Sequence, residues 1–401
     1  MKYKLSITLT KKQEEGLKIA VQRYRQGEKY TVISGFAGSG KSTLIKFIIE
    51  ALGADEEAVA YVAYTGKAAN VLAKKGCPNA ITAHKLLYWA KPMPNGSYKF
   101  SPKPKWEVPY SVIVVDEVSM LPKPMWDLLL SHDAYILATG DPEQLPPVDK
   151  DADNHVLDTP HIFLDEIMRQ AQDSEIIRLS MWVREGKILS QFPVLGEQVQ
   201  IVDSNSVVDG MYEWADQILC ATNVKRHEIN NFVRQQKGFG IEPCIGDKVI
   251  SLRNHWDWSS KEGTWALTNG SIGAIKYMDK RNVWLPRYIY DGGPVPYLYT
   301  SIDLDDGDEF IMVPIDYTAL KTGDTLLSNK QIYLLNKNDS LPDAPFEFAY
   351  AYAITTHKAQ GSEWDKVLVF EEWFPNMAEE HRRWLYTAIT RASEKLVVVK
   401  K

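Results

Sequence analysis

The feature that most constrains this chain is the stretch at residues 35–42, which reads GFAGSGKS. It matches the pattern G-x-x-x-x-G-K-[ST] at every fixed position. An apolar run at 30–34 precedes it, and a helical pattern at 43–52 follows it. Glycines between a strand and a helix let backbone N–H groups curl around phosphate oxygens, and the helix N-terminus adds its dipole. The stretch therefore predicts a phosphate-binding loop within an α/β fold.

This loop also indicates how a nucleotide and a metal ion would be held. Lys41 would reach the β- and γ-phosphates, and the Ser42 hydroxyl would ligate Mg²⁺. The expected ligands are therefore ATP and Mg²⁺. The residues expected to contact the nucleotide in this stretch are Gly35, Phe36, Ala37, Gly38, Ser39, Gly40, Lys41, Ser42 and Thr43.

A pair of carboxylates follows a second apolar run, since residues 112–117 read VIVVDE. Asp116 is expected to hold the hydrated Mg²⁺, and Glu117 to orient or deprotonate the attacking water. A nucleotide-dependent switch would not need the second carboxylate, so the pair favours hydrolysis.

Composition is that of an ordinary globular protein of 401 residues, with 45% hydrophobic and 24% charged residues. The cysteines Cys77, Cys220 and Cys244 are far apart, so neither a disulfide framework nor a cysteine zinc site is expected. No run approaches the ~18 apolar residues of a membrane helix, and the N-terminus lacks the apolar region of a signal peptide. We therefore expect a cytoplasmic protein without a membrane partner.

Short apolar runs alternate with helical patterns along the chain, which is typical of parallel strands joined by helices. Residues 91–106 interrupt this rhythm with a proline-rich segment, and their Asn95-Gly96 pair favours a hairpin. Residues 246–345 read as an all-β segment of alternating runs and turns. The expected α/β strands are 30–34, 59–63, 112–115, 134–138, 218–221, 351–355, 367–370 and 396–399.

Further motifs occur in a fixed order, and together with the loop they resemble the superfamily 1 DNA helicases of the RecD/Dda-like 5′-to-3′ group. The resemblance covers residues 9–399 apart from 246–345. The motifs are LTxxQ at 9–13, AYTGKAA at 63–69, TAH at 82–84, DEVSM at 116–120, GDPEQLPPV at 140–148, LDEIMRQ at 164–170, THKAQGSE at 356–363 and LYTAITRA at 385–392.

This resemblance implies an α/β fold with two RecA-like P-loop NTPase domains. A small β-hairpin is inserted in the first domain and an SH3-like all-β unit in the second. Motor domain 1A is expected at 1–160, with the hairpin insertion 1B at 90–107. Motor domain 2A is expected at 161–245 and 346–401, on either side of insertion 2B at 246–345.

The resemblance also implies roles around the nucleotide. Gln13 would contact adenine, and Gly361 and Glu363 would bind the nucleotide, Glu363 at the ribose. Two arginines would approach the γ-phosphate from the second domain, because a guanidinium spreads donors over the phosphoryl oxygens. For either arginine alone, the alternative is a surface salt bridge. The expected catalytic residues are Lys41, Asp116, Glu117, the γ-phosphate sensor Gln144, Arg169 and Arg391.

DNA is expected to meet short loops at strand ends, where small or basic groups contact phosphates without reading sequence. For Thr82 and His84 the alternatives are helix capping and a satisfied core histidine. Hairpin 1B would separate the strands by stacking an aromatic ring on the last base pair, or else its aromatic residues fold back on the first domain. The expected DNA-binding residues are Thr65, Lys67, Thr82, His84, Tyr98, Phe100, Thr356 and His357.

Two features stand out in insertion 2B. Its tryptophans, Trp256, Trp258, Trp265 and Trp284, either stack on bases or form the core of a small barrel. Residues 301–345 hold three lysines against nine acidic residues, which accounts for the net charge of −6 of the whole chain. We expect this acidic patch to face away from DNA.

The expected function is that of an ATP-dependent helicase that translocates 5′ to 3′ on single-stranded DNA and separates strands at duplex junctions, as a monomer. One alternative is a DNA-stimulated ATPase that remodels protein–DNA complexes with little unwinding. Another is a nucleic-acid-binding module with a vestigial ATP site, which is disfavoured because Lys41, Asp116, Glu117 and Arg391 are all present. The short form of the chain fits a phage or bacterial origin.

Overall fold

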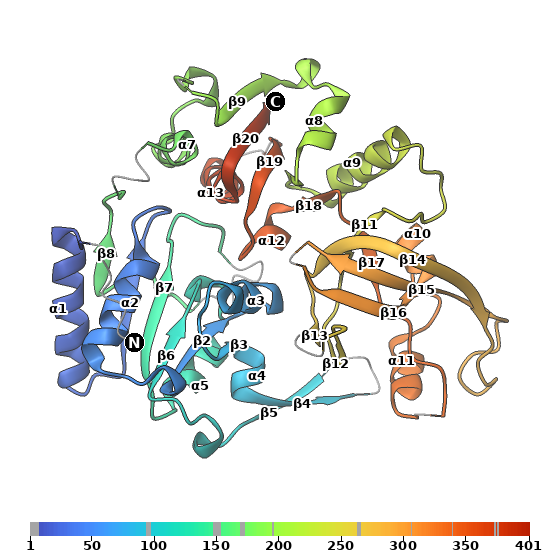
Figure 1. Ribbon diagram of the computed structural model, residues 1–401, viewed down its shortest axis with the longest axis horizontal. Helices are drawn as coiled ribbons and strands as arrows, with labels where there is room; N and C mark the ends of the chain where they lie inside the picture. Colours follow the sequence, from blue (N-terminus) through green and yellow to red (C-terminus); the bar gives the residue numbers. More distant parts are fainter. Residues whose placement is uncertain are drawn as a thin grey trace.

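Three β-sheets organise the computed structural model (Figure 1). The first and second sheets are parallel and the third is antiparallel. No helix in the described part of the chain is long and apolar enough to cross a membrane. The structure describes residues 8–93, 98–146, 154–168, 173–194, 196–262, 266–305, 307–338, 340–372, 374 and 377–401.

The first sheet has the strand order β3-β2-β6-β7-β1-β8. Val32 and Ile33 on β1 are nearly inaccessible and belong to different cores, so the sheet is covered on both faces. Helices α1 and α2 pack on one face, and α4 and α5 on the other. The strands are β1 (Tyr30–Gly35), β2 (Val59–Ala63), β3 (Ala80–Thr82), β6 (Val112–Val115), β7 (Tyr135–Gly140) and β8 (Ile162–Leu164), and the helices are α1 (Lys11–Arg25), α2 (Lys41–Leu52), α3 (Gly66–Lys74), α4 (Ala83–Leu87) and α5 (Lys123–Leu130).

Strand β8 corrects one expected boundary. It pairs in parallel with β1, for example Ile33 with Ile162, so the first unit extends past the expected limit at 160. The apolar run of β8, at 162–164, is only three residues long and has polar neighbours, so the sequence pattern does not indicate a strand there.

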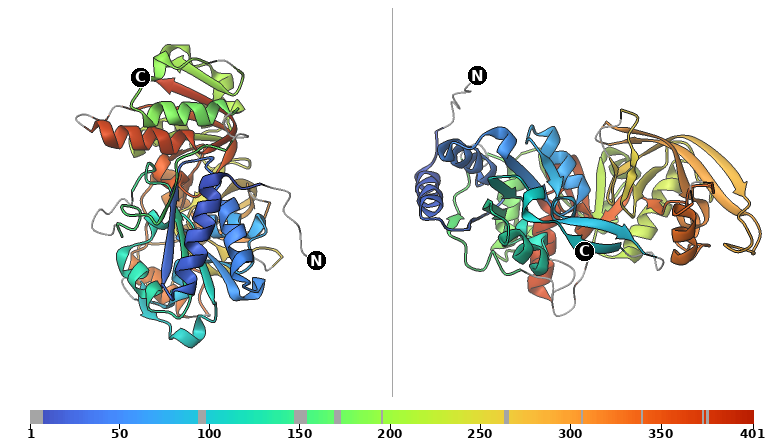
Figure 2. Two further views of the ribbon diagram at one scale, coloured as in Figure 1. Left: turned by 90° about the vertical axis from the view of Figure 1, so that its left-hand side faces the viewer. Right: turned by 90° about the horizontal axis from the view of Figure 1, so that it is seen from below.

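A two-stranded hairpin leaves the first sheet after α4. Strands β4 (Tyr88–Pro92) and β5 (Tyr98–Pro102) are antiparallel, with Pro92 opposite Tyr98. The hairpin extends toward the third sheet in Figure 1 and in the right-hand view of Figure 2. The Asn95-Gly96 turn itself lies outside the described residues.

The second sheet has the order β18-β10-β19-β20-β9 and is assembled from two distant parts of the chain. Helices α7 and α13 pack on one face, and α8 and α9 on the other. The strands are β9 (Val199–Asp203), β10 (Gln217–Cys220), β18 (Ala353–Thr355), β19 (Trp364–Phe370) and β20 (Ala392–Lys400), and the helices are α7 (Glu175–Arg184), α8 (Asp209–Trp214), α9 (Asn223–Gln236), α12 (Thr356–Ala359) and α13 (Ala378–Ile389). The expectation of two parallel α/β sheets is confirmed.

The third sheet has the order β16-β15-β14-β11-β17, and it corrects two expectations. It extends past 345, because β17 pairs with β11 and not with the second sheet. The region that forms this sheet is also not all-β, because it contains two helices between β16 and β17. Its elements are β11 (Lys248–Ser251), β14 (Ile272–Val283), β15 (Val295–Leu304), β16 (Glu309–Asp316), β17 (Phe348–Tyr350), α10 (Tyr317–Thr322) and α11 (Asn329–Asn336), beside a separate pair, β12 (His255–Ser259) and β13 (Ala266–Leu267).

One tryptophan of this region lies in the core, and base stacking by the others stays a prediction. Trp258 packs edge-on against Phe346 in the core of the third sheet. Trp284 is 73% exposed at the far end of β14 and β15. Trp265 and the side chain of Trp256 lie outside the described residues.

Candidate ATP site and nucleic-acid face

The phosphate-binding loop joins β1 to α2, as the sequence predicts. Gly38 and Gly40 adopt φ values of 75° and 81°, a left-handed conformation that favours glycine. A Cβ on Gly35 would lie 2.7 Å from Ser39 Oγ, so that position also requires glycine. The loop therefore keeps the compact path that directs N–H groups at the start of α2 toward one point.

Two side chains support this loop. Lys41 Nζ donates to the carbonyls of Gly35 and Phe36 at 2.7 and 3.1 Å, and burial lowers the pKa of its ammonium group. Gln13 on α1 is 1% exposed, and its amide nitrogen lies 3.4 Å from the carbonyls of Ser39 and Gly40. The structure thus places Gln13 against the loop, next to the position expected for a nucleotide.

The carboxylates follow β6 and differ in their surroundings. Asp116 Oδ1 accepts a hydrogen bond from Thr139 Oγ1 at 3.0 Å, which orients it beside β7. Glu117 has a φ of 48°, a left-handed conformation that costs a non-glycine residue energy. Burial raises the pKa of its carboxyl group, although the nearby Arg391 opposes the shift. Such strain at a partly buried carboxylate is typical of active sites.

Arg391 reaches this carboxylate from the second sheet. Its Nη1 lies 3.7 Å from Glu117 Oε1, and the residue is only 6% exposed. Its guanidinium also donates to the carbonyls of Thr387 and Ser362 at 3.1 and 3.2 Å. The structure thereby brings together Lys41, Asp116, Glu117 and Arg391, whereas Arg169 lies outside the described residues.

The segment that follows β7 is held by the second sheet. The backbone N–H of Leu145 donates to Thr387 Oγ1 at 2.9 Å, and its carbonyl accepts from Gln360 Nε2 at 2.9 Å. These contacts fix the position of the neighbouring Gln144. Thr387 and Gln360 were not among the expected site residues, although both lie within the motifs that define the resemblance.

Two expected nucleotide contacts lie in motif THKAQGSE. A Cβ on Gly361 would lie 3.7 Å from Glu117 Oε2, so Gly361 is close to the carboxylate of Glu117. Glu363 is about half exposed and pairs with Lys75 at the end of α3 at 3.5 Å. Its expected contact with ribose stays a prediction.

The expected DNA contacts follow the carboxyl ends of strands, as Thr65 follows β2, Thr82 follows β3 and Thr356 follows β18. Thr65 and Thr82 cap α3 and α4 by accepting backbone N–H groups at 3.2 Å. Capping was the alternative considered for Thr82. Thr356 is fully buried and donates to the carbonyl of Cys220, so its hydroxyl is not available to contact DNA.

Basic and aromatic groups lie near the same carboxyl ends of strands. Lys67 lies over the ring of Trp364 at 4.6 Å, where the first and second sheets meet. His357 is partly buried, which lowers the pKa of its imidazole. Burial also lowers the pKa of His84, whose ring packs between Tyr64 at 5.5 Å and Phe100 at 5.1 Å.

Phe100 is therefore folded back on the first unit, with Tyr88 at 5.6 Å as a further neighbour. This is the alternative arrangement considered for the hairpin aromatics, and Phe100 is nonetheless 43% exposed. The side chain of Tyr98, nearest the tip, lies outside the described residues.

Four carboxylates of the acidic segment in the third sheet pair with neighbouring lysines. Asp303, Asp305 and Glu309 pair with lysines of the same sheet region. Asp308 pairs with Lys74 on α3 at 3.4 Å, so this part of the patch faces the first unit.

Comparison with known proteins identifies two matching family models. One, described as an AAA domain, matches residues 8–209, and the other, a UvrD-like helicase C-terminal domain, matches residues 350–399. The chain is 28% identical to the ATP-dependent RecD2 DNA helicase of Deinococcus radiodurans, over 92% of this chain and 46% of that protein. It is 27% identical to the ATP-dependent DNA helicase dda of Enterobacteria phage T4, over 96% of this chain and 97% of that protein.

Solved structures show the same fold at lower sequence identity. The Pif1 helicase from Bacteroides, in complex with ADP-AlF3 and single-stranded DNA, superposes with a TM-score of 0.54 at 18% identity. That match covers 98% of this chain and 92% of the other. The Pif1 helicase from Candida albicans gives a TM-score of 0.51 at 20% identity, covering 98% and 94% of the two chains.

Proposed function

Because this chain belongs to the RecD/Dda-like group of superfamily 1 helicases, we propose that it uses ATP hydrolysis to translocate 5′ to 3′ on single-stranded DNA and to separate duplex strands. The observation that carries the proposal is the placement of Arg391 against Glu117, across the boundary between the two parallel sheets, at 3.7 Å. An arginine supplied from a second unit makes hydrolysis depend on how the two units are arranged.

The chemistry follows from the residues around the loop. Lys41 would bind the phosphates of ATP, and Glu117 would activate the attacking water. Arg391 would stabilise the charge that develops on the transferred phosphoryl group. Mg²⁺ fits the oxygen donors of Ser42 and Asp116, because this ion takes few protein ligands and keeps phosphates and waters as the others.

We assign the first sheet to motor domain 1A and the β4–β5 hairpin to insertion 1B. The second sheet forms motor domain 2A, and the third forms insertion 2B. ATP binding would close 1A and 2A around the nucleotide, and hydrolysis would let them part. A strand gripped in turn by the two domains would then advance through the protein.

The DNA track would run over the carboxyl ends of β2, β3 and β18. Lys67 and His357 would meet phosphates there, and Thr65 would contribute through the start of α3. Phosphate contacts of this kind carry no sequence information, which suits a motor that acts on any strand. We expect a monomer to suffice, since one chain supplies both halves of the ATP site.

Two duplexes test the proposal, one with a 5′ single-stranded tail and one with a 3′ tail. Strand separation from the 5′ tail alone is expected. Separation only from the 3′ tail would contradict the polarity. ATP hydrolysis stimulated by oligo-dT, with neither duplex opened, would favour the remodelling alternative, which the folded-back Phe100 also favours.

Lys41→Ala is the control for the ATP site. This variant is expected to bind single-stranded DNA like the wild type and to lose ATP hydrolysis. Retained hydrolysis would place the active site elsewhere.

A further inference from the structure

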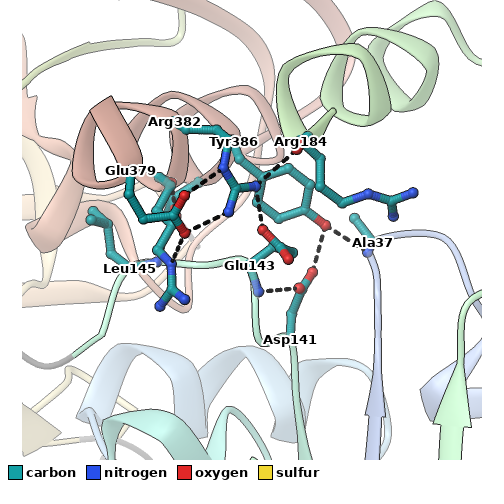
Figure 3. Close-up of polar contacts among 10 residues, drawn as sticks. Ala37, Asp141, Glu143, Leu145, Arg184, Glu379, Arg382 and Tyr386 are labelled. Carbon is teal, nitrogen blue, oxygen red and sulfur yellow. Dashed lines mark hydrogen bonds and ion pairs between the residues drawn. The ribbon is translucent and has the colours of Figure 1, made fainter. Parts of the chain in front are cut away.

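The hydroxyl group of Tyr386 bridges the phosphate-binding loop and the segment that follows β7. It donates to Asp141 Oδ2 at 2.6 Å and accepts the backbone N–H of Ala37 at 3.1 Å (Figure 3). Tyr386 is on α13 of the second sheet, whereas Ala37 belongs to the phosphate-binding loop and Asp141 follows β7. One hydroxyl therefore ties the second sheet to two loops of the first.

The carboxylate that accepts this hydroxyl is buried. Asp141 is 4% exposed, and burial raises the pKa of its carboxyl group. Its other oxygen, Oδ1, accepts the backbone N–H of Glu143 at 3.0 Å. Tyr386 itself is 1% exposed, so water has little access to replace its hydroxyl. A hydrogen bond to a buried carboxylate is stronger than one between neutral groups.

Neighbouring contacts hold α13 at the same place. Arg382 pairs with Glu143 and donates to the carbonyl of Arg184 at 3.0 Å, as Figure 3 shows. The guanidinium of Arg184 in turn lies over the ring of Phe36 at 3.6 Å. The tip of the phosphate-binding loop, Phe36 and Ala37, is thus contacted from the second sheet by two side chains, on α7 and α13.

We propose that Tyr386 is a positioning residue for ATP hydrolysis, which holds α13 against the phosphate-binding loop so that Arg391 faces Glu117. The inference rests on the proposed function, because it assigns a role within the same reaction. Arg391 lies two residues past the end of α13, so the hydroxyl sets how far its guanidinium stands from the first sheet. Tyr386 touches the loop and not the reacting atoms, so its effect is on closure of the site.

Tyr386→Phe tests this role, because it removes the hydroxyl and keeps the ring. With saturating oligo-dT, kcat for ATP hydrolysis is expected to fall about tenfold. The KM for ATP is expected to change less than about twofold, since the phosphate-binding loop itself is intact. A role in folding alone would lower the unfolding temperature and leave kcat unchanged.

Trp384→Phe is the matched control on the same helix. Trp384 is fully buried and packs on Phe374 and His381, within the second sheet's own unit. This variant is expected to lower the unfolding temperature and to keep kcat. If Tyr386→Phe reduces kcat no more than Trp384→Phe does, Tyr386 has no positioning role.

The contact can also be tested from its other side. Asp141→Asn is expected to lower kcat as Tyr386→Phe does, and the double variant should be no slower than the slower single variant. Additive losses would show that the two residues act independently and would overturn the inference. This comparison stays decisive even if Tyr386→Phe lowers the unfolding temperature. A wild-type protein without DNA-stimulated ATPase would instead refute the proposed function.

Discussion

Gly66 is the first residue of α3, at the place where the first and third sheets meet. Replacing it by alanine should have two opposite effects on the free energy, one on the helix and one on the contact with the third sheet. A Cβ at Gly66 would lie 2.4 Å from both Cβ and Cγ2 of Thr268. Thr268 is 3% exposed and follows β13 in a tight turn. Its carbonyl accepts Ser271 N–H at 3.0 Å, and its hydroxyl lies 3.2 Å from Ser271 Oγ. The turn therefore has little freedom to move aside.

The two terms have opposite signs. Alanine in place of glycine favours a helix by about 1 kcal/mol, so a local effect on α3 would be stabilising. Inserting a methyl group into a packed contact costs about 1–3 kcal/mol, because rigid neighbours must shift. Ordinary contact begins at 3.4 Å, so α3 and the turn must separate by about 1 Å. We expect the clash to win at the contact and to move the third sheet away from Thr65 and Lys67.

The readout is affinity for single-stranded DNA, measured by fluorescence anisotropy without nucleotide. A loss of about 1–2 kcal/mol corresponds to a five- to thirty-fold weaker Kd. Gly210→Ala is the matched control: Gly210 is also in the first turn of a helix, and a Cβ there would meet nothing within 4 Å. Thr268→Gly combined with Gly66→Ala should recover part of the affinity. If Gly66→Ala only stabilises the protein, as Gly210→Ala should, the reasoning about this contact is wrong.

Three further predictions concern Glu117, Arg391 and the hairpin. Burial raises the pKa of the Glu117 carboxyl group above its ordinary value of 4.5, so its base form is lost as pH falls through that raised pKa. The acid limb of the pH profile of kcat/KM should therefore lie above pH 4.5, and the residual activity of Glu117→Gln should lack this limb. Arg391→Lys should lower kcat about a hundredfold with little change in the KM for ATP, since a lysine cannot replace three oriented donors; a loss below threefold would contradict the role. Phe100→Ala should reduce strand separation and leave ATPase intact because it loosens the base of the hairpin, whereas the 76% exposed Trp106, changed to alanine as control, should have no effect; equal unwinding in both variants would exclude a role for the Phe100 ring.

The fold was predictable where local pattern and structure coincide. Strands β2 and β6 have the expected bounds because each is a continuous apolar run buried on both faces. Strand β8 was missed, since its three residues form a strand only by pairing with β1. Helices α10 and α11 were missed because they lie inside an acidic segment whose neighbours alternate like strands.

The same division holds for the candidate site. Lys41, Asp116 and Glu117 come from motifs whose spacing is local, so the sequence alone indicates them. Tyr386 and Arg184 contact the phosphate-binding loop from helices that pack on the second sheet, and no local pattern specifies which loop they will meet. The left-handed backbone of Glu117 is likewise a consequence of the folded surroundings, since glutamate has no preference for it.

The position of β20 inside the second sheet has a consequence for synthesis of the protein. Strand β20 lies between β19 and β9, so β9 has no partner strand until residues 392–400 have left the ribosome. The first sheet is complete once β8 has emerged, and N-terminal units fold first during translation. A nascent chain can thus form the loop that binds ATP long before Arg391 is available to act on it. Under the proposed function, translation itself would separate nucleotide binding from rapid turnover.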